Sequence, residues 1–129
     1  MNLIKAYHSL PSDIKKIYRL VIVGEFMEPT FSNCLDYVKN NGLDELVIFK
    51  GKVTYSALPD LYRNCELFIF PSSCENCPNI LLEAIGCGAP VIVSKTNPMP
   101  EFAKDAALYI DEHQYKRYRK KNINCPVKS

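Results

Sequence analysis

Two glutamates frame the part of this sequence best suited to binding a polar ligand. Glu75 lies among small and polar residues after the apolar run 67–70, and Glu83 follows with seven residues between them, inside a helix-like segment. Carboxylates accept hydrogen bonds from sugar hydroxyls, and the free N–H groups at a helix start suit a phosphate. These groups describe a site for a polyhydroxylated, phosphorylated ligand. The alternative from the residues alone is two ordinary solvated acids, because most charged side chains face water.

The same segment carries a cysteine pair, Cys74 and Cys77, separated by two residues. Such a pair is typical of redox-active dithiols, and Cys87 adds a third thiol that could ligate zinc. No second cysteine pair or histidine pair stands at a metal-ligating spacing. We therefore favour small residues filling a tight loop, predict no metal site, and keep the redox or zinc module as an alternative.

Short apolar runs alternate with amphipathic segments along the chain. The runs predict strands, and the segments with helical spacing predict helices. Asn79 is predicted to cap its helix, and a turn is predicted near 98–101. The strands are expected at 20–23, 46–49, 67–70, 91–93 and 107–110, and the helices at 3–10, 31–41, 55–64 and 79–87.

Buried strands that alternate with helices are typical of a parallel sheet covered on both faces. We predict a doubly wound, Rossmann-like α/β domain over residues 1–111 and a basic tail over 112–129. Ligands of such sheets bind beyond the carboxyl ends of the strands. The loops that begin at Gly24, Gly51 and Pro71 should therefore share one edge.

Composition limits the function classes further. The chain has 129 residues, 47% of them apolar, and a net charge of +2. This balance does not indicate nucleic-acid binding, and no apolar run approaches the roughly 20 residues of a membrane span. No signal peptide is evident, so we expect a cytoplasmic protein with reduced thiols. The cations at 116–121 could add a peripheral membrane contact.

Residues 71–84 resemble the E-x7-E motif of the group 1 glycosyltransferases, the retaining family 4 with the GT-B fold. The resemblance extends over 51–112, and the stretches RLVIVGE and LIKAY resemble earlier elements of the family in the same order. It implies the donor-binding half of a GT-B enzyme, truncated at both ends. One departure is the sequence Asn76-Cys77-Pro78-Asn79 where many members are glycine-rich.

The resemblance also implies roles for single residues. The catalytic pair would be Glu75, which holds the transferred sugar, and Glu83, which binds the ribose of the nucleotide. The other binding residues would surround the base, sugar and diphosphate. Gly51, Lys52 and Val53 would line the base pocket, Gly24 and Glu25 would form a loop near the diphosphate, and Cys77, Asn79, Ile80 and Leu81 would face the sugar and diphosphate.

The activity implied is retaining transfer of a hexose from a UDP- or GDP-linked sugar to a glycan or lipid-linked acceptor. The nucleotide sugar is a substrate, and no bound cofactor is implied. The family's acceptor-binding N-terminal domain and a basic pair that neutralises the leaving diphosphate have no counterpart here. We expect little activity from the chain alone. A non-catalytic nucleotide or nucleotide-sugar binder is a further alternative.

Overall fold

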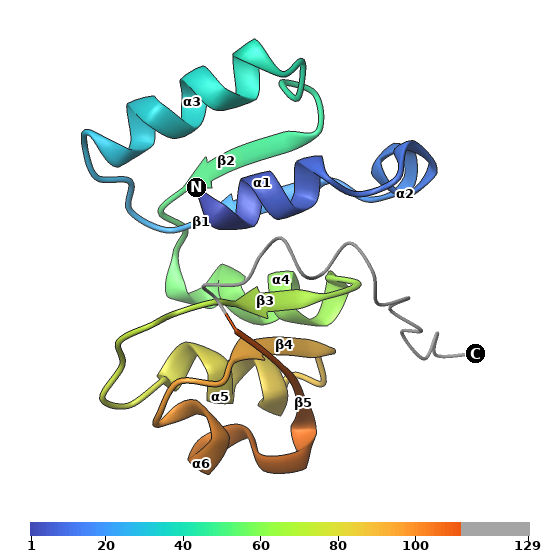
Figure 1. Cartoon of the computed structure of the whole chain (residues 1–129). Coiled ribbons are helices and arrows are strands. Elements are labelled where there is room, and N and C mark those ends of the chain that lie inside the picture. The colour runs from blue at the N-terminus through green and yellow to red at the C-terminus, as the bar shows by residue number, and fades with distance from the viewer. Residues whose placement is uncertain (112–129) are drawn as a thin grey trace.

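The computed structural model describes residues 1–111 of the 129-residue chain, so the predicted basic tail lies outside the described residues. Helices and strands alternate along these residues (Figure 1). In order they are α1 (Asn2–His8), α2 (Ser12–Ile17), β1 (Leu20–Val23), α3 (Thr30–Asn40), β2 (Val47–Gly51), the 3-10 turn η1 (Tyr55–Ala57), α4 (Leu58–Asn64), β3 (Phe68–Phe70), α5 (Asn79–Gly86), β4 (Val91–Ser94), α6 (Met99–Ala103), the 3-10 turn η2 (Lys104–Ala106) and β5 (Ala107–Ile110).

All strand pairs in the described residues are parallel, which confirms the predicted α/β class. The strands form two hydrogen-bonded ladders, β1–β2 and β3–β4–β5. Within residues 1–111, β1 and β3 each pair along one edge, and their other edges face each other across the molecule (Figure 1). Two parallel ladders with helices between successive strands fit the predicted doubly wound arrangement.

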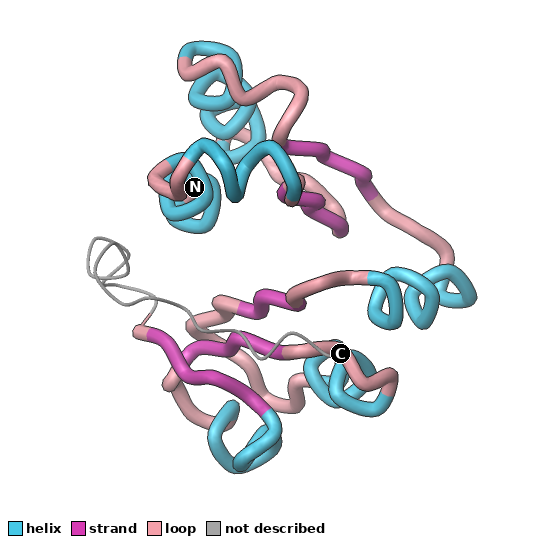
Figure 2. Tube along the Cα trace, turned by 90° about the vertical axis from the view of Figure 1, so that its right-hand side faces the viewer, coloured by secondary structure: helices cyan, strands magenta, loops and turns pink. Residues whose placement is uncertain are grey.

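The helices cover the two ladders from opposite sides (Figure 2). Helices α1 and α3 pack on β1 and β2, where Ile4, Val38 and Val47 are buried together. Helices α4, α5 and α6 pack on the other ladder around Leu81, Val93 and Met99. The two sets of buried residues have no member in common, so the described chain has two separate apolar cores.

Burial differs from strand to strand. Every residue of β4 is buried, as predicted for a strand covered on both faces. In β1 the burial alternates, with Val21 and Val23 exposed, and β2 exposes Ile48, so the prediction of buried strands is wrong for both. The reason is that α1 and α3 cover one face of this ladder only.

The structure differs from the sequence predictions at three local features. Residues 12–17 form α2, which was not predicted, and residues 99–103 form α6 where a turn was expected. Pro78, not Asn79, is the N-cap of α5, and no side chain caps this helix. No helix within residues 1–111 is long and apolar enough to cross a membrane.

Candidate functional site

The carboxyl ends of β1, β2 and β3 lie at the same edge of the molecule, as predicted (Figure 1). Val23 at the end of β1 pairs with Gly51 at the end of β2. The N–H of Gly24 donates to the carbonyl oxygen of Gly51 over 3.0 Å. Gly51 has a φ of +74°, a backbone conformation that favours glycine. The two loops therefore begin side by side.

Glu25 and Lys52 join these two loops through their side chains. Lys52 Nζ lies 3.6 Å from Glu25 Oε2, and both side chains are largely exposed. An exposed ion pair contributes little to stability, because water and salt screen it. Lys52 is therefore a cation that a bound anion could recruit without a large cost in folding free energy. The adjacent Val53 is half-buried.

Glu75 occupies the loop between β3 and α5 and is half-buried. Its Oε1 accepts a hydrogen bond from the Ser72 hydroxyl over 2.8 Å. The carbonyl oxygen of Ser72 in turn accepts a hydrogen bond from the hydroxyl of Ser94, a fully buried residue at the end of β4. A chain of contacts thus ties the Glu75 carboxylate to the sheet.

The first turn of α5 presents one open amide to this edge. The N–H groups of Leu81 and Leu82 donate to the carbonyl oxygen of Pro78, and the N–H of Asn79 donates to that of Cys77. The N–H of Ile80 donates to no acceptor within residues 1–111. An open amide at a helix start suits an anion.

The side chains of this turn differ in accessibility. Ile80 is exposed, whereas the Leu81 side chain is completely buried in the core. Leu81 therefore has neither an accessible side chain nor a free N–H with which to meet a ligand. The Cys77 thiol contacts the side-chain oxygen of Asn79 at 3.3 Å.

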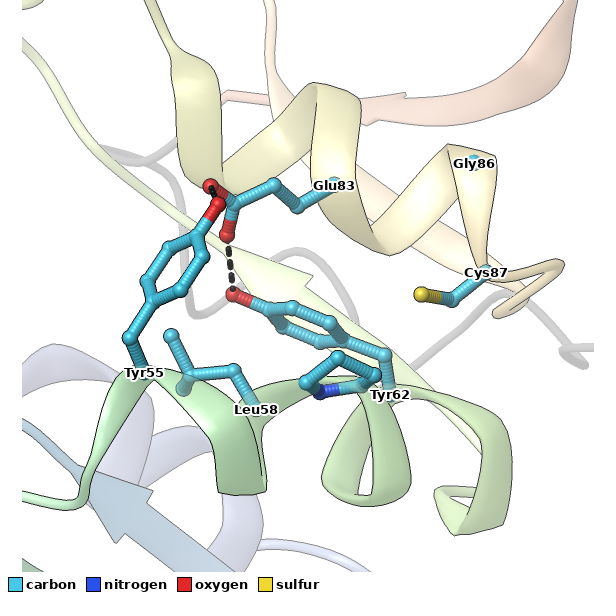
Figure 3. A pocket seen from close by; sticks show the side chains of 7 residues that line it. Tyr55, Leu58, Tyr62, Glu83, Gly86 and Cys87 are labelled. Atoms are coloured by element: carbon cyan, nitrogen blue, oxygen red, sulfur yellow. Dashed lines mark hydrogen bonds between the residues drawn. The ribbon is translucent and has the colours of Figure 1, made fainter.

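Glu83 lies on the side of α5 that faces α4, and two tyrosines point to it (Figure 3). The Tyr55 hydroxyl donates to Glu83 Oε1 over 3.0 Å, and the Tyr62 hydroxyl donates to Oε2 over 3.3 Å. Burial, followed by the nearby Glu83 charge, raises the pKa of Tyr62 to about 12. The hydrogen bond to Glu83 raises the pKa of Tyr55 above its ordinary value.

A cavity of about 270 Å³ adjoins Glu83 between α4 and α5. Besides the carboxylate it is lined by apolar groups, by the two tyrosines and by Cys87 (Figure 3). Its volume is slightly below the roughly 300 Å³ at which small-molecule sites begin. It can hold part of a ligand, such as one ring.

The candidate residues thus form three separate local groups. Gly24, Glu25, Gly51 and Lys52 are linked to one another, Glu75 is linked to Ser72, and Glu83 is linked to the two tyrosines. Within residues 1–111 no hydrogen bond joins Glu75 to Glu83.

Sequence reasoning identified the glutamates but missed their partners. Tyr62 is buried, whereas Tyr55 is exposed. Their contacts with Glu83 span 21 and 28 residues of sequence, so no local pattern could have indicated them.

Cys74 and Cys77 are both exposed, and neither forms a disulfide bond within the described residues. Among residues 1–111, no group of three histidine, cysteine or acidic side chains is arranged to hold a metal ion.

Comparison with known proteins gives a consistent family. The profile of the family described as "Glycosyl transferases group 1" matches residues 1–123. The chain is 34% identical over 100 residues to the Escherichia coli serotype-specific mannosyltransferase WbdA, covering 77% of the chain and 12% of that protein. It is 30% identical over 110 residues to the Escherichia coli O-antigen chain mannosyltransferase B, covering 85% of the chain and 29% of that protein.

A solved structure of similar fold is that of Anabaena Alr3699/HepE in complex with UDP. It superposes with a TM-score of 0.76 at 20% identity, over 92% of this chain and 32% of that one. The chain thus spans less than a third of the length of each of these three proteins.

Proposed function

The chain belongs to the group 1 glycosyl transferases, and we propose that it binds a nucleotide sugar and supplies the donor side of a glycosyl transfer. The donor is a UDP- or GDP-linked hexose. The names of two relatives, both mannosyltransferases, favour mannose, and the UDP complex of a protein of similar fold favours a nucleoside diphosphate as the carrier.

The observation that carries this proposal is the position of the two glutamates around the start of α5. Glu75 precedes the helix and Glu83 lies within it, and the helix begins at the edge where the loops after β1 and β2 also begin (Figure 1). Two carboxylates and one open amide are groups that a sugar, a ribose and a diphosphate can use as hydrogen-bond partners.

Each residue has a proposed task in binding the donor. Glu75 accepts hydrogen bonds from the hydroxyls of the transferred sugar, and Glu83 accepts them from the ribose. The open N–H of Ile80, with Cys77 and Asn79 beside it, faces the sugar and diphosphate. Gly24 and Glu25 form the loop near the diphosphate, and Gly51, Lys52 and Val53 line the base site. Leu81 supports the helix start from within the core.

The transfer itself is proposed to proceed with retention to a glycan or lipid-linked acceptor. It is proposed to require an acceptor-binding N-terminal domain. Among the proposed site residues Lys52 is the only cation, and it is assigned to the base site, so no cation is assigned to the charge of the leaving diphosphate. Stabilising that charge is commonly a large part of catalysis. We therefore propose that the chain needs this partner domain for turnover, and that the basic stretch 116–121 adds a peripheral membrane contact.

The test is calorimetric titration of the pure chain with UDP, GDP and ADP. We expect saturable binding that is selective for one base. The variant Glu83→Ala should weaken that binding about tenfold or more, because a hydrogen bond to a charged group contributes roughly 1.5–3 kcal/mol.

Glu45→Ala is the matched control, because Glu45 is an exposed acid just before β2, at the opposite edge of its ladder. This control should bind like the wild type. Equal weakening in both variants, or no binding of any of the three nucleotides by the wild type, would contradict the proposal. Activity that appears on adding an acceptor domain in trans would separate a transferase from a non-catalytic binder.

A further inference from the structure

The Glu83 carboxylate already has two hydrogen-bond donors, one on each oxygen. Tyr62 donates to Oε2 and Tyr55 donates to Oε1 (Figure 3). A carboxylate offers about four acceptor positions, so each oxygen can take a further donor or exchange the one it has. How firmly each tyrosine is held therefore decides what a ligand meets.

Tyr62 is held firmly by the core. It is 5% exposed, and its ring packs edge-to-face on the Phe68 ring at 5.4 Å between centroids and 88° between planes. Its pKa of about 12 keeps the phenol protonated in any ordinary buffer. Tyr62 is thus a permanent hydrogen-bond donor in a fixed place.

Tyr55 is held by little besides Glu83. Its side chain is 74% exposed, on the short turn η1 that precedes α4. Within residues 1–111, its hydroxyl is hydrogen-bonded to the Glu83 carboxylate. An exposed contact of this kind exchanges readily with water or with a ligand hydroxyl.

We propose that Tyr62 is a positioning residue that orients the Glu83 carboxylate toward the vicinal hydroxyls of a nucleotide's ribose, and that Tyr55 is the exchangeable partner that the ribose replaces. This inference rests on the proposed function. A vicinal diol presents two O–H donors, the same chemistry that the two phenols present in the free protein. When the ribose binds, its hydroxyls take the place of Tyr55, while Tyr62 remains on Oε2.

The experiment compares each nucleoside diphosphate with its 2′,3′-dideoxy analogue, which lacks the diol. Dissociation constants are measured by calorimetry for the wild type, Tyr62→Phe and Tyr55→Phe, using whichever of UDP, GDP or ADP binds. Tyr62→Phe should weaken binding of the ribose form about three- to tenfold, the effect of one hydrogen bond, and leave the dideoxy form unchanged. Tyr55→Phe should bind the ribose form as tightly as the wild type or several-fold more tightly.

Tyr7→Phe is the matched control. Tyr7 is also buried, and its hydroxyl donates to the carbonyl oxygen of Tyr18 over 2.7 Å, but it belongs to the other core. It should leave the ratio of ribose to dideoxy affinity unchanged, so a general loss of stability cannot imitate the expected result.

The failures of the two proposals are distinguishable. If the wild type binds none of the nucleotides, the proposed function fails and this inference fails with it. If the wild type prefers the ribose form and Tyr62→Phe keeps the same preference, this inference alone is overturned. If Tyr62→Phe does not fold, Tyr55→Phe still tests the proposal, because Tyr55 is exposed. Weaker binding of the ribose form by Tyr55→Phe than by the wild type would contradict the proposed replacement of Tyr55 by the ribose.

Discussion

The Tyr62 phenol lies between the apolar core and a carboxylate, and this position governs its protonation. In the folded chain its pKa is raised from 10.0 to about 12. The folded state therefore holds this proton more tightly than the unfolded state does. The stabilisation is fully present below the pKa of the unfolded phenol and is lost as the pH rises through that of the folded one.

We expect the free energy of unfolding of the wild type to fall between about pH 10 and pH 12 more steeply than that of Tyr62→Phe. Urea unfolding at a series of alkaline pH values measures both curves. Comparing two proteins that differ in one hydroxyl removes the contribution of the lysines and the other tyrosines. If the free energies of unfolding of the two proteins changed with pH in parallel, the pKa of Tyr62 would not differ between the folded and unfolded states.

The individual residues of the site were only partly predictable. Glu75 and Glu83 could be selected because their types and spacing lie where a strand passes into a helix. The partners of Glu83 could not be selected, because Tyr55 and Tyr62 reach it only once α4 packs on α5. Long-range packing, unlike periodicity, leaves no local trace in a sequence.

At the scale of elements, the strands were the most predictable part, because each is a short apolar run bounded by polar or turn-forming residues. There are physical reasons why the sequence did not predict helices α2 and α6. Helix α2 has only six residues and buries none of them, so the spacing of Ile14 and Ile17 alone is too short a pattern to predict a helix. Helix α6 carries Pro100 in its first turn, and two prolines within 98–101 suggested a turn, although proline is well tolerated at a helix start.

The turn after β2 offers a test of how strictly its backbone is required. A Cβ added at Gly51 meets no atom within 4 Å, so the cost of Gly51→Ala comes from its φ of +74° alone. We expect a loss of about 1–2 kcal/mol in the free energy of unfolding. Chemical denaturation measures this change.

Gly86→Ala is the matched substitution, because a Cβ at Gly86 also meets open space and this glycine, in α5, has no positive φ. It should stabilise the chain by about 0.5–1 kcal/mol, since alanine favours a helix. A loss of stability at Gly86 similar to that at Gly51 would show that backbone conformation is not the cause.

At the scale of the whole molecule, the two apolar cores should behave as separate cooperative units. Ile4 belongs to the core around α1 and α3, and Met99 belongs to the core around α5 and α6, and no buried residue is shared. Domains with one core normally unfold in a single step. We expect two steps here, because neither core loses its packing when the other opens.

Hydrogen exchange followed by mass spectrometry tests this expectation. Ile4→Ala should speed exchange in β1, β2 and α3, and Met99→Ala should speed it in β4, β5 and α5. Each variant should leave the other set of elements protected. Acceleration of both sets by either variant would show one cooperative unit.

The open edges of β1 and β3 affect how the chain behaves in concentrated solution. Along each edge, backbone N–H and carbonyl groups lack a strand partner within residues 1–111, and Val21 and Val23 expose apolar surface beside one of them. An unpaired strand edge can form backbone hydrogen bonds with a strand of another molecule. This pairing requires an encounter between two molecules, so it is rare in a dilute sample. Self-association should therefore increase with protein concentration, and light scattering should detect it before any binding experiment is attempted.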